Sequence, residues 1–227
     1  MELSLRLQKI ADFVPEGTSV ADIGTDHAHL PIWLIEQKKI KKAYAMDIGE
    51  GPLSRATEAI HKYQMDDVIE TRLSDGLEKL EAGEADTVVI AGMGGPLICN
   101  ILERRRDLWD SISQFILSPQ SELQMVRKFL RDNGLAIVRE EMIVDMDKYY
   151  TVMKVVVGNS KHTSEIEDLY GGCLLENKDE VLWKYLQQEK KIKEHIYQNL
   201  PHSARERKHE LKEELALNAS ARKLFER

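Results

Sequence analysis

Short apolar runs alternate with segments of helical periodicity along the first 130 residues of this chain, and this rhythm constrains its fold more than any other feature. The apolar runs predict strands at 19–23, 41–47, 68–73, 86–91 and 114–117. The segments around them predict helices at 3–13, 28–37, 51–63, 96–106 and 122–132. Strands that alternate with helices in this way are typical of an α/β protein built on a parallel, doubly wound sheet.

The pattern changes after residue 134. Residues 135–144 and 151–157 are two β-type runs with about six residues between them, too few for a crossover helix. The two runs are therefore expected to pair as an antiparallel hairpin. A Rossmann-like doubly wound sheet that ends in such a hairpin is the layout of the class I methyltransferases, whereas an NAD-binding sheet stays parallel to its sixth strand.

The C-terminal part of the chain is helical and highly charged. One apolar stripe contains Leu182, Leu186, Ile192, Ile196 and Leu200, and a thinner stripe follows the break at residues 201–203. Two helices with a tight break between them predict an antiparallel coiled-coil hairpin. We therefore expect a cofactor-binding methyltransferase domain at residues 1–160 and a helical domain at residues 161–227.

The first predicted strand ends in Asp22-Ile23-Gly24-Thr25-Asp26-His27, and a helical pattern begins directly afterwards. A dinucleotide fingerprint would need two more glycines so that the backbone could approach a pyrophosphate. Acidic side chains beside Gly24 suit a cationic ligand such as S-adenosylmethionine, and the helix N-terminus suits its carboxylate. The alternative is a plain strand-to-helix turn in which Asp26 caps the helix.

Two further acids follow the next two predicted strands. Asp47, with Ile48 after it, ends the second strand at the distance from Gly24 where an acid reaches ribose hydroxyls. Ser74-Asp75-Gly76 ends the third strand, where the Asp could accept a hydrogen bond from the adenine amino group; the alternative is an ordinary Asp-Gly turn. Because ligands bind at the carboxyl ends of strands in open α/β sheets, we assign all of these residues to a cofactor site.

Gly92-Met93-Gly94-Gly95 follows the fourth predicted strand. Strands one and four flank the switch point of a doubly wound sheet, so this loop is expected to face Gly24 across the crevice. Its glycines would let the backbone approach the transferred methyl group or a flat base. We assign Gly92 and Met93 to the cofactor site and Met93 and Gly94 to the reacting centre.

These motifs, with Leu30-Pro31 and Ser118-Pro119-Gln120, resemble those of the bacterial tRNA adenine-22 N1-methyltransferases, and the resemblance extends over the whole chain. That family combines a class I sheet with a C-terminal coiled-coil hairpin. The resemblance implies transfer of a methyl group from S-adenosylmethionine to N1 of adenine 22 in the tRNA D-arm.

The chemistry of adenine N1 sets what such a site needs. N1 already has an in-plane lone pair, so the enzyme has to expose the base, align N1 with the methyl group and exclude water. An acceptor aimed at the exocyclic amino group would stabilise the cationic product. Asp26 is the first candidate for this acceptor, although its carboxylate could bind the methionine ammonium instead. The alternative acceptors are the backbone carbonyls of residues 92–94. His27 could orient either the Asp26 carboxylate or the base.

RNA binding is expected from basic clusters, although the formal net charge is −7. Residues 175–227 carry 12 Lys and Arg against 10 Asp and Glu, so the tail is mildly basic while the remainder is acidic. The clusters are Arg6 with Lys9, residues 38–42, Arg104-Arg105-Arg106, and six Lys and Arg between residues 190 and 208. Tyr149 and Tyr150, expected at the tip of the hairpin, are candidates to stack on a base.

The composition excludes several classes of protein. Two isolated cysteines exclude a disulfide scaffold or a CxxC metal site, and no apolar run reaches the ~20 residues of a membrane span. We expect a cytoplasmic, metal-free protein without a secretory signal, and favour a monomer. Two alternatives stay open: a class I methyltransferase with another RNA position or a small molecule as its substrate, and a nucleotide-sensing module without catalysis.

Overall fold

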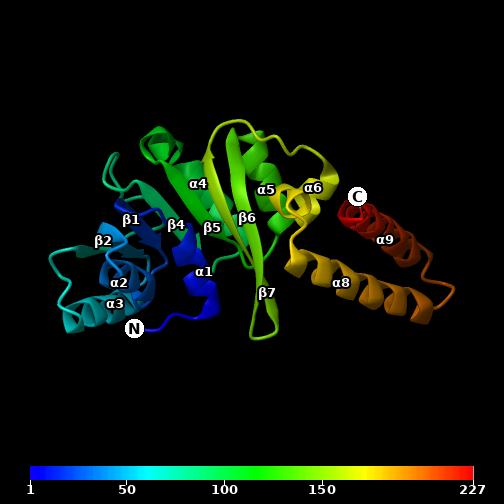
Figure 1. Cartoon of the computed structure of the whole chain (residues 1–227), viewed down its shortest axis with the longest axis horizontal. Helices are drawn as coiled ribbons and strands as arrows, with labels where there is room; N and C mark the ends of the chain where they lie inside the picture. The colour runs from blue at the N-terminus through cyan, green and yellow to red at the C-terminus, as the bar shows by residue number, and fades with distance from the viewer. Residues whose placement is uncertain (227) are drawn as a thin grey trace.

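The structure, a computed structural model, describes residues 1–226, so that Arg227 at the end of the expected helical domain lies outside the described residues. Within this range seven strands form one sheet in the order β3-β2-β1-β4-β5-β7-β6, in which β7 is antiparallel to its neighbours (Figure 1). The strands are β1 Thr18–Ile23, β2 Ile40–Asp47, β3 Ile69–Leu73, β4 Thr87–Ala91, β5 Gln114–Ser118, β6 Leu135–Asp145 and β7 Lys148–Val157. The predicted doubly wound sheet with a terminal antiparallel hairpin is thus confirmed.

Helices cover both faces of the sheet. The helices before residue 133 are α1 Leu5–Phe13, α2 His29–Glu36, α3 Glu50–Lys62, α4 Gly95–Arg104 and α5 Leu123–Asp132, with a 3-10 turn, η1, at Arg106–Ser111. Apolar residues of α1, α2 and α3 form one core on one face, and those of α4 and α5 form another on the opposite face. The last four residues of β1 are buried, as expected for a central parallel strand that is covered on both sides.

The hairpin between β6 and β7 is tighter than the sequence predicted. Only Met146 and Asp147 separate the two strands, and both have positive φ, 48° and 60°. Two successive residues with positive φ form the turn type that matches the twist of the flanking strands. The estimate of about six connecting residues was wrong because this turn lacks the usual Asn-Gly signal. Tyr149 and Tyr150 consequently lie within β7 rather than at the tip.

The C-terminal helices are α6 Glu165–Tyr170, α7 Gly172–Glu176, α8 Glu180–Asn199 and α9 Arg205–Phe225. Helices α8 and α9 form the expected hairpin, which extends away from the sheet (Figure 1). A third core at its base contains Leu174, Leu182, Leu186 and Ala221.

The apolar stripe predicted on α8 is buried only in its first half. Ile192 and Ile196 are exposed because charged side chains of α9 face this part of the helix; Lys193, for example, bridges Glu189 and Glu214. The outer part of the hairpin is therefore held by ion pairs rather than by a continuous apolar seam.

Candidate functional site

The four loops assigned to the site lie side by side at the carboxyl edge of the sheet. Backbone N–H groups of Gly24 and Thr25 donate to Met46 O at 2.8 and 3.1 Å, and Ser74 N donates to Asp47 O at 2.8 Å. On the other side of β1, Gly92 N donates to Ser118 O at 3.2 Å. These contacts join the ends of β1, β2 and β3 and the ends of β4 and β5, and the pairing of β1 with β4 makes them one continuous rim.

Gly24 and Met93 face each other across this rim. Gly24 has φ +79°, and a Cβ placed on it would collide with Met93 Cε. The positive φ therefore favours glycine at this position, whereas the Met93 methyl group, at the end of a flexible side chain, could move aside. Met93 O accepts a hydrogen bond from Gln120 N at 2.9 Å, which ties the loop after β4 to the loop after β5.

A cavity of about 280 Å³ opens beside Gly24. Five of the residues that line it were assigned from the sequence: Asp22, Gly24, Thr25, Asp26 and His27. The other five are Arg6, Leu7, His29, Leu30 and Ala91. A cavity lined by a buried carboxylate, a guanidinium and two imidazoles is suited to a small zwitterionic ligand.

Asp22 is the most strongly perturbed acid of this cavity. Burial raises the pKa of its carboxyl to about 6; the nearby Thr25 hydroxyl opposes this rise, and the negative charge of Asp47 adds to it. A buried carboxylate without a cationic partner is costly, and a bound cation would remove that cost.

Two buried polar atoms at the cavity have no hydrogen-bond partner among the described residues. They are Arg6 Nη1 and Thr25 Oγ1, which acts on the Asp22 carboxyl without reaching hydrogen-bond geometry. Arg6 belongs to α1, and its guanidinium carbon lies 5.4 Å from the centre of the Tyr150 ring. A Cβ on Gly92 would lie 3.3 Å from Arg6 Nη1. Such orphaned groups indicate a ligand that supplies the missing partners.

Asp26 does not cap α2, because that helix begins at His29 and its N-cap position is Ala28. Asp26 has φ +44°, and its Oδ1 accepts a hydrogen bond from Arg55 Nη2 at 2.5 Å. This bond, with smaller effects from His27 and His29, lowers the pKa of the carboxyl. Asp26 is thus an exposed, ionised side chain at the mouth of the cavity, held by a residue of α3.

The imidazoles of His27 and His29 stack with their ring centres 5.2 Å apart. Partial burial, and then the proximity of His27, lower the pKa of His29. His29 and Arg6 are the cavity residues that the sequence reasoning missed as ligand-binding candidates. No local signal marks them, since only the packing of α1 and α2 brings their side chains here.

The remaining assigned residues lie along the same rim but outside this cavity. Asp47 Oδ1 accepts from Gly49 N at 2.8 Å, which leaves its second oxygen for a ligand, and Ile48 is exposed. The Ser74 hydroxyl donates to Gly76 O and accepts from Lys79 N, so it stabilises the turn after β3. Asp75 is paired with Arg104 at 2.9 Å rather than free.

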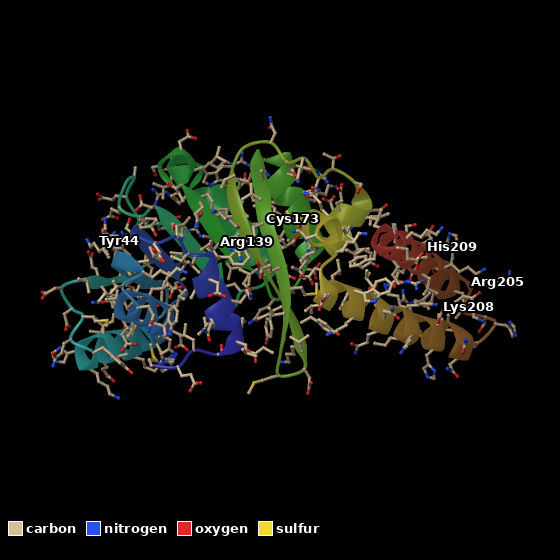
Figure 2. All side chains as sticks on the ribbon, viewed as in Figure 1. Tyr44, Arg139, Cys173, Arg205, Lys208 and His209 are labelled. Carbon is tan, nitrogen blue, oxygen red and sulfur yellow. The ribbon has the colours of Figure 1, made fainter. Side chains whose placement is uncertain are left out.

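The predicted basic clusters differ in how much positive charge they leave available. Each arginine of the cluster at 104–106 is paired with an acid: Arg104 with Asp75 and Glu78, Arg105 with Asp107, and Arg106 with Glu103. Arg205 and Lys208, near the free end of the helical hairpin (Figure 2), form no ion pair with any other residue from 1 to 226. The positive charge of the cluster at 104–106 is therefore neutralised, whereas Arg205 and Lys208 remain candidates for contacts with phosphate groups.

In the range 1–226 no three His, Cys, Asp or Glu side chains are grouped so that they could hold a metal ion. No helix in that range combines the length and the apolar composition needed to cross a bilayer.

Comparisons with known proteins agree with this geometry. A family model described as a methyltransferase domain matches residues 3–153. The chain is 33% identical to the tRNA (adenine(22)-N(1))-methyltransferase of Bacillus subtilis (strain 168) over 220 residues, which cover 94% of this chain and 92% of that protein.

Solved structures of the same length are also similar. A Streptococcus pneumoniae protein in complex with S-adenosyl-L-methionine is 30% identical, with a TM-score of 0.88 over 97% of this chain and 99% of that one. M. capricolum TrmK in complex with the cofactor product S-adenosyl-homocysteine is 29% identical, with a TM-score of 0.87 over 99% of this chain and 100% of that one. The similarity includes both the sheet and the helical hairpin.

Proposed function

The chain belongs to the family of tRNA (adenine(22)-N(1))-methyltransferases, and on this premise we propose that it transfers a methyl group from S-adenosylmethionine to N1 of adenine 22 in tRNA. The observation that carries the function is the extent of the match. It covers 94% of this chain, and therefore includes the helical hairpin as well as the sheet that all class I methyltransferases share. We further propose that residues 1–160 bind the cofactor and that residues 161–227 help to bind the tRNA.

The cavity beside Gly24 fits the methionine end of S-adenosylmethionine. When bound, that cofactor supplies an electrophilic methyl group on a positively charged sulfur. Asp22 provides the negative charge for the ammonium group, which would stabilise the ionised form of this buried carboxyl. Arg6, with its unpaired Nη1, provides the positive charge for the carboxylate, and Thr25 Oγ1 adds a hydrogen bond.

The adenosine end would lie along the rim formed by the ends of β2 and β3. Asp47 has one oxygen available for ribose hydroxyls. The Asp75 carboxylate is paired with Arg104. It could accept a hydrogen bond from the adenine amino group only if its second oxygen made that bond or if the ion pair with Arg104 opened. Ile48, which is exposed at the rim, provides an apolar surface for the base.

The protein does not have to generate the nucleophile, because adenine N1 carries an in-plane lone pair. The work left to the chain is to hold N1 in line with the methyl group and to exclude water. Gly92, Met93 and Gly94 border the space opposite Gly24. Met93 O already accepts from Gln120 N, and Gly94 O accepts from Leu97 N and Ile98 N, so Gly92 O is the carbonyl left to accept from the exocyclic amino group. Asp26 is the alternative acceptor, since its carboxylate is ionised at the mouth of the cavity.

The function is tested by nucleoside mass spectrometry. Full-length protein is incubated with S-adenosylmethionine and an unmodified tRNA transcript that has adenine at position 22, and the digest is analysed for 1-methyladenosine. A transcript with guanine at position 22 serves as the matched control. Incorporation into the first transcript alone supports the proposal; no incorporation, or equal incorporation into both, contradicts it.

A further inference from the structure

A second cavity, of about 570 Å³, lies between the sheet and the helical hairpin. One wall is the beginning of β7, and the other is the face of α8 from Tyr185 to Lys193, with Gln120 of the loop after β5 at one end. This volume lies in the range of sites that hold small ligands or a single base. None of the roles given above to the cofactor site uses this groove.

The groove is aromatic and amide-rich. The rings of Tyr149 and Tyr185 meet edge to face at 5.1 Å, and Tyr150 forms part of the same wall. The Tyr149 hydroxyl donates to Gln188 Oε1 at 2.8 Å, which directs the Gln188 amide N–H groups away from that tyrosine. Aromatic faces that stack and amides that both donate and accept are the groups by which proteins recognise unpaired bases.

The charges of the groove favour a base over a phosphate. Glu189 accepts from Tyr170 and Asn218 and is paired with Lys193 at 2.9 Å. Lys193 is paired with Glu214 as well, at 3.0 Å. Its positive charge is therefore neutralised within the hairpin, and Ile192, 51% exposed, presents an apolar surface beside it. At the other wall Asp147 and Lys148 carry opposite charges, so the four charged side chains that line the groove sum to zero. A groove without net charge, with Ile192 exposed in its lining, suits a flat, uncharged group.

The groove continues into the cofactor cleft. Gln120 N donates to Met93 O, and Gln120 Nε2 lies 3.8 Å from the position of a Cβ on Gly92. Tyr150 forms part of the groove and also lies under the guanidinium of Arg6, which lines the cofactor cavity. A nucleotide chain that places one base opposite Gly24 can therefore place a neighbouring base in the groove.

We propose that this groove binds an unpaired base of the tRNA next to the target adenine, a proposal that rests on the proposed function. The base stacks on the tyrosines of β7 and α8, contacts Ile192, and thereby fixes the register in which adenine 22 enters the cleft. The helical hairpin thus takes part in positioning the substrate at the active site.

The test uses two exposed isoleucines of α8. Ile192→Glu places a charge in the groove, whereas Ile196→Glu places the same charge one turn further along the helix, outside it. With the tRNA transcript and the full-length protein, Ile192→Glu should raise KM for tRNA about tenfold, the order expected when one stacked base is lost. Ile196→Glu should stay within about twofold of the wild type. Both variants should keep wild-type cofactor affinity and melting temperature.

A fluorescence readout identifies the base. Transcripts carry 2-aminopurine on the 5′ or the 3′ side of adenine 22, and stacking on the tyrosines should quench one of them with the wild type but not with Ile192→Glu. Equal loss for both glutamate variants, or bound tRNA with neither probe quenched, overturns the proposal while methylation by the wild type still stands. If the wild type methylates no tRNA, the proposed function fails, and this inference fails with it.

Discussion

Asp22 connects ligand binding with stability at the scale of a single residue. In the folded protein burial raises the pKa of its carboxyl from 3.8 to about 6. The folded state therefore holds its proton more tightly than the unfolded state does. Stability consequently falls as pH rises from about 4 to about 6, and the full cost, about 3 kcal/mol, is present above that window.

We expect Asp22→Asn to stabilise the free protein by about 1–3 kcal/mol at pH 8 and to have little effect near pH 4. The substitution removes the buried charge but also the partner for the methionine ammonium, so affinity for S-adenosylmethionine should fall at least tenfold. Thermal melting at the two pH values and calorimetric titration measure the two effects. In the wild type, cofactor affinity should weaken as pH drops below about 6. A variant that is destabilised at pH 8, or one that binds normally, would contradict this role.

Asp26 tests whether a residue at the cavity mouth serves the cofactor or the base. Its ion pair with Arg55 is exposed, so Asp26→Ala should change stability by less than about 1 kcal/mol. If the carboxylate accepts from the adenine amino group, kcat should fall roughly 10- to 100-fold while cofactor affinity stays within about threefold.

Arg55→Ala is the matched variant, because it frees Asp26 without removing the carboxylate. A positioning role for Arg55 predicts a smaller loss in kcat and no change in KM for tRNA. If Asp26→Ala instead weakens cofactor binding and leaves kcat intact, the residue belongs to the methionine subsite, and the Gly92 carbonyl becomes the acceptor.

Sequence motifs predicted five of the ten residues that line the cavity beside Gly24, and the other five are brought there by tertiary packing. Asp22, Gly24 and Asp47 could be assigned because each lies at the carboxyl end of a strand that faces the crevice. Arg6 lies on a helix that precedes the first strand, and it was expected to contact RNA with Lys9. Lys9 is instead paired with Glu141 of β6, which helps to fix α1 across the sheet and brings Arg6 to the cofactor cavity.

At the scale of helices and strands, the alternation of apolar and helical segments predicted the order of the elements. It did not predict the conformation of the turns between them. β4 and β5 are nearly uninterrupted apolar runs, and the ends of all five parallel strands were predicted to within about two residues. The turn at Met146-Asp147 could not be recognised, because methionine does not favour positive φ and no glycine occupies either turn position.

A buried ion pair links the sheet domain to the short helix α6. Arg127 of α5 donates through Nε to Glu140 Oε1 of β6 at 2.9 Å and through Nη1 to the backbone oxygens of Asp168 and Leu169 in α6. The Glu140 side chain has no exposed surface, and burial raises the pKa of its carboxyl despite the opposing effect of Arg127. This arrangement makes Arg127 a connector between three elements.

Arg127→Ala should destabilise the protein by about 3–5 kcal/mol, because it leaves the Glu140 carboxylate buried without a partner. The loss should be larger at pH 8 than at pH 5, since protonation of Glu140 relieves it at low pH. Chemical denaturation of the variant at both pH values measures this. The control is the double variant Arg127→Met with Glu140→Leu, which removes both charges and should recover most of the loss; a double variant as unstable as Arg127→Ala would show that the backbone contacts of Arg127 dominate.

At the scale of the whole molecule, an acidic protein has to bind a polyanion. The formal net charge is −7, and the arginines of the 104–106 cluster are neutralised by neighbouring acids. Cations that form no ion pair among residues 1–226 include Arg205 and Lys208 near the free end of the helical hairpin (Figure 2), and also Lys38, Lys39 and Lys41 around the start of β2. Lys208 also lies 5.5 Å from the centre of the Tyr197 ring, which fixes its position on the surface. We propose that the cations at the end of the hairpin contact the tRNA and help to orient it on the molecule.

We therefore expect Arg205→Ala and Lys208→Ala each to weaken tRNA binding and to reduce the slope of log Kd against log salt concentration by about 1. Arg104→Ala is the matched control, since this arginine is exposed but already engaged by Asp75 and Glu78. Its slope should equal that of the wild type, and all three variants should bind S-adenosylmethionine normally if the hairpin contacts only the RNA. Filter binding at four salt concentrations between about 50 and 200 mM resolves a difference of this size. A reduced slope for Arg104→Ala, with unchanged slopes for the two hairpin variants, would move the tRNA contact from the hairpin to the surface of α4.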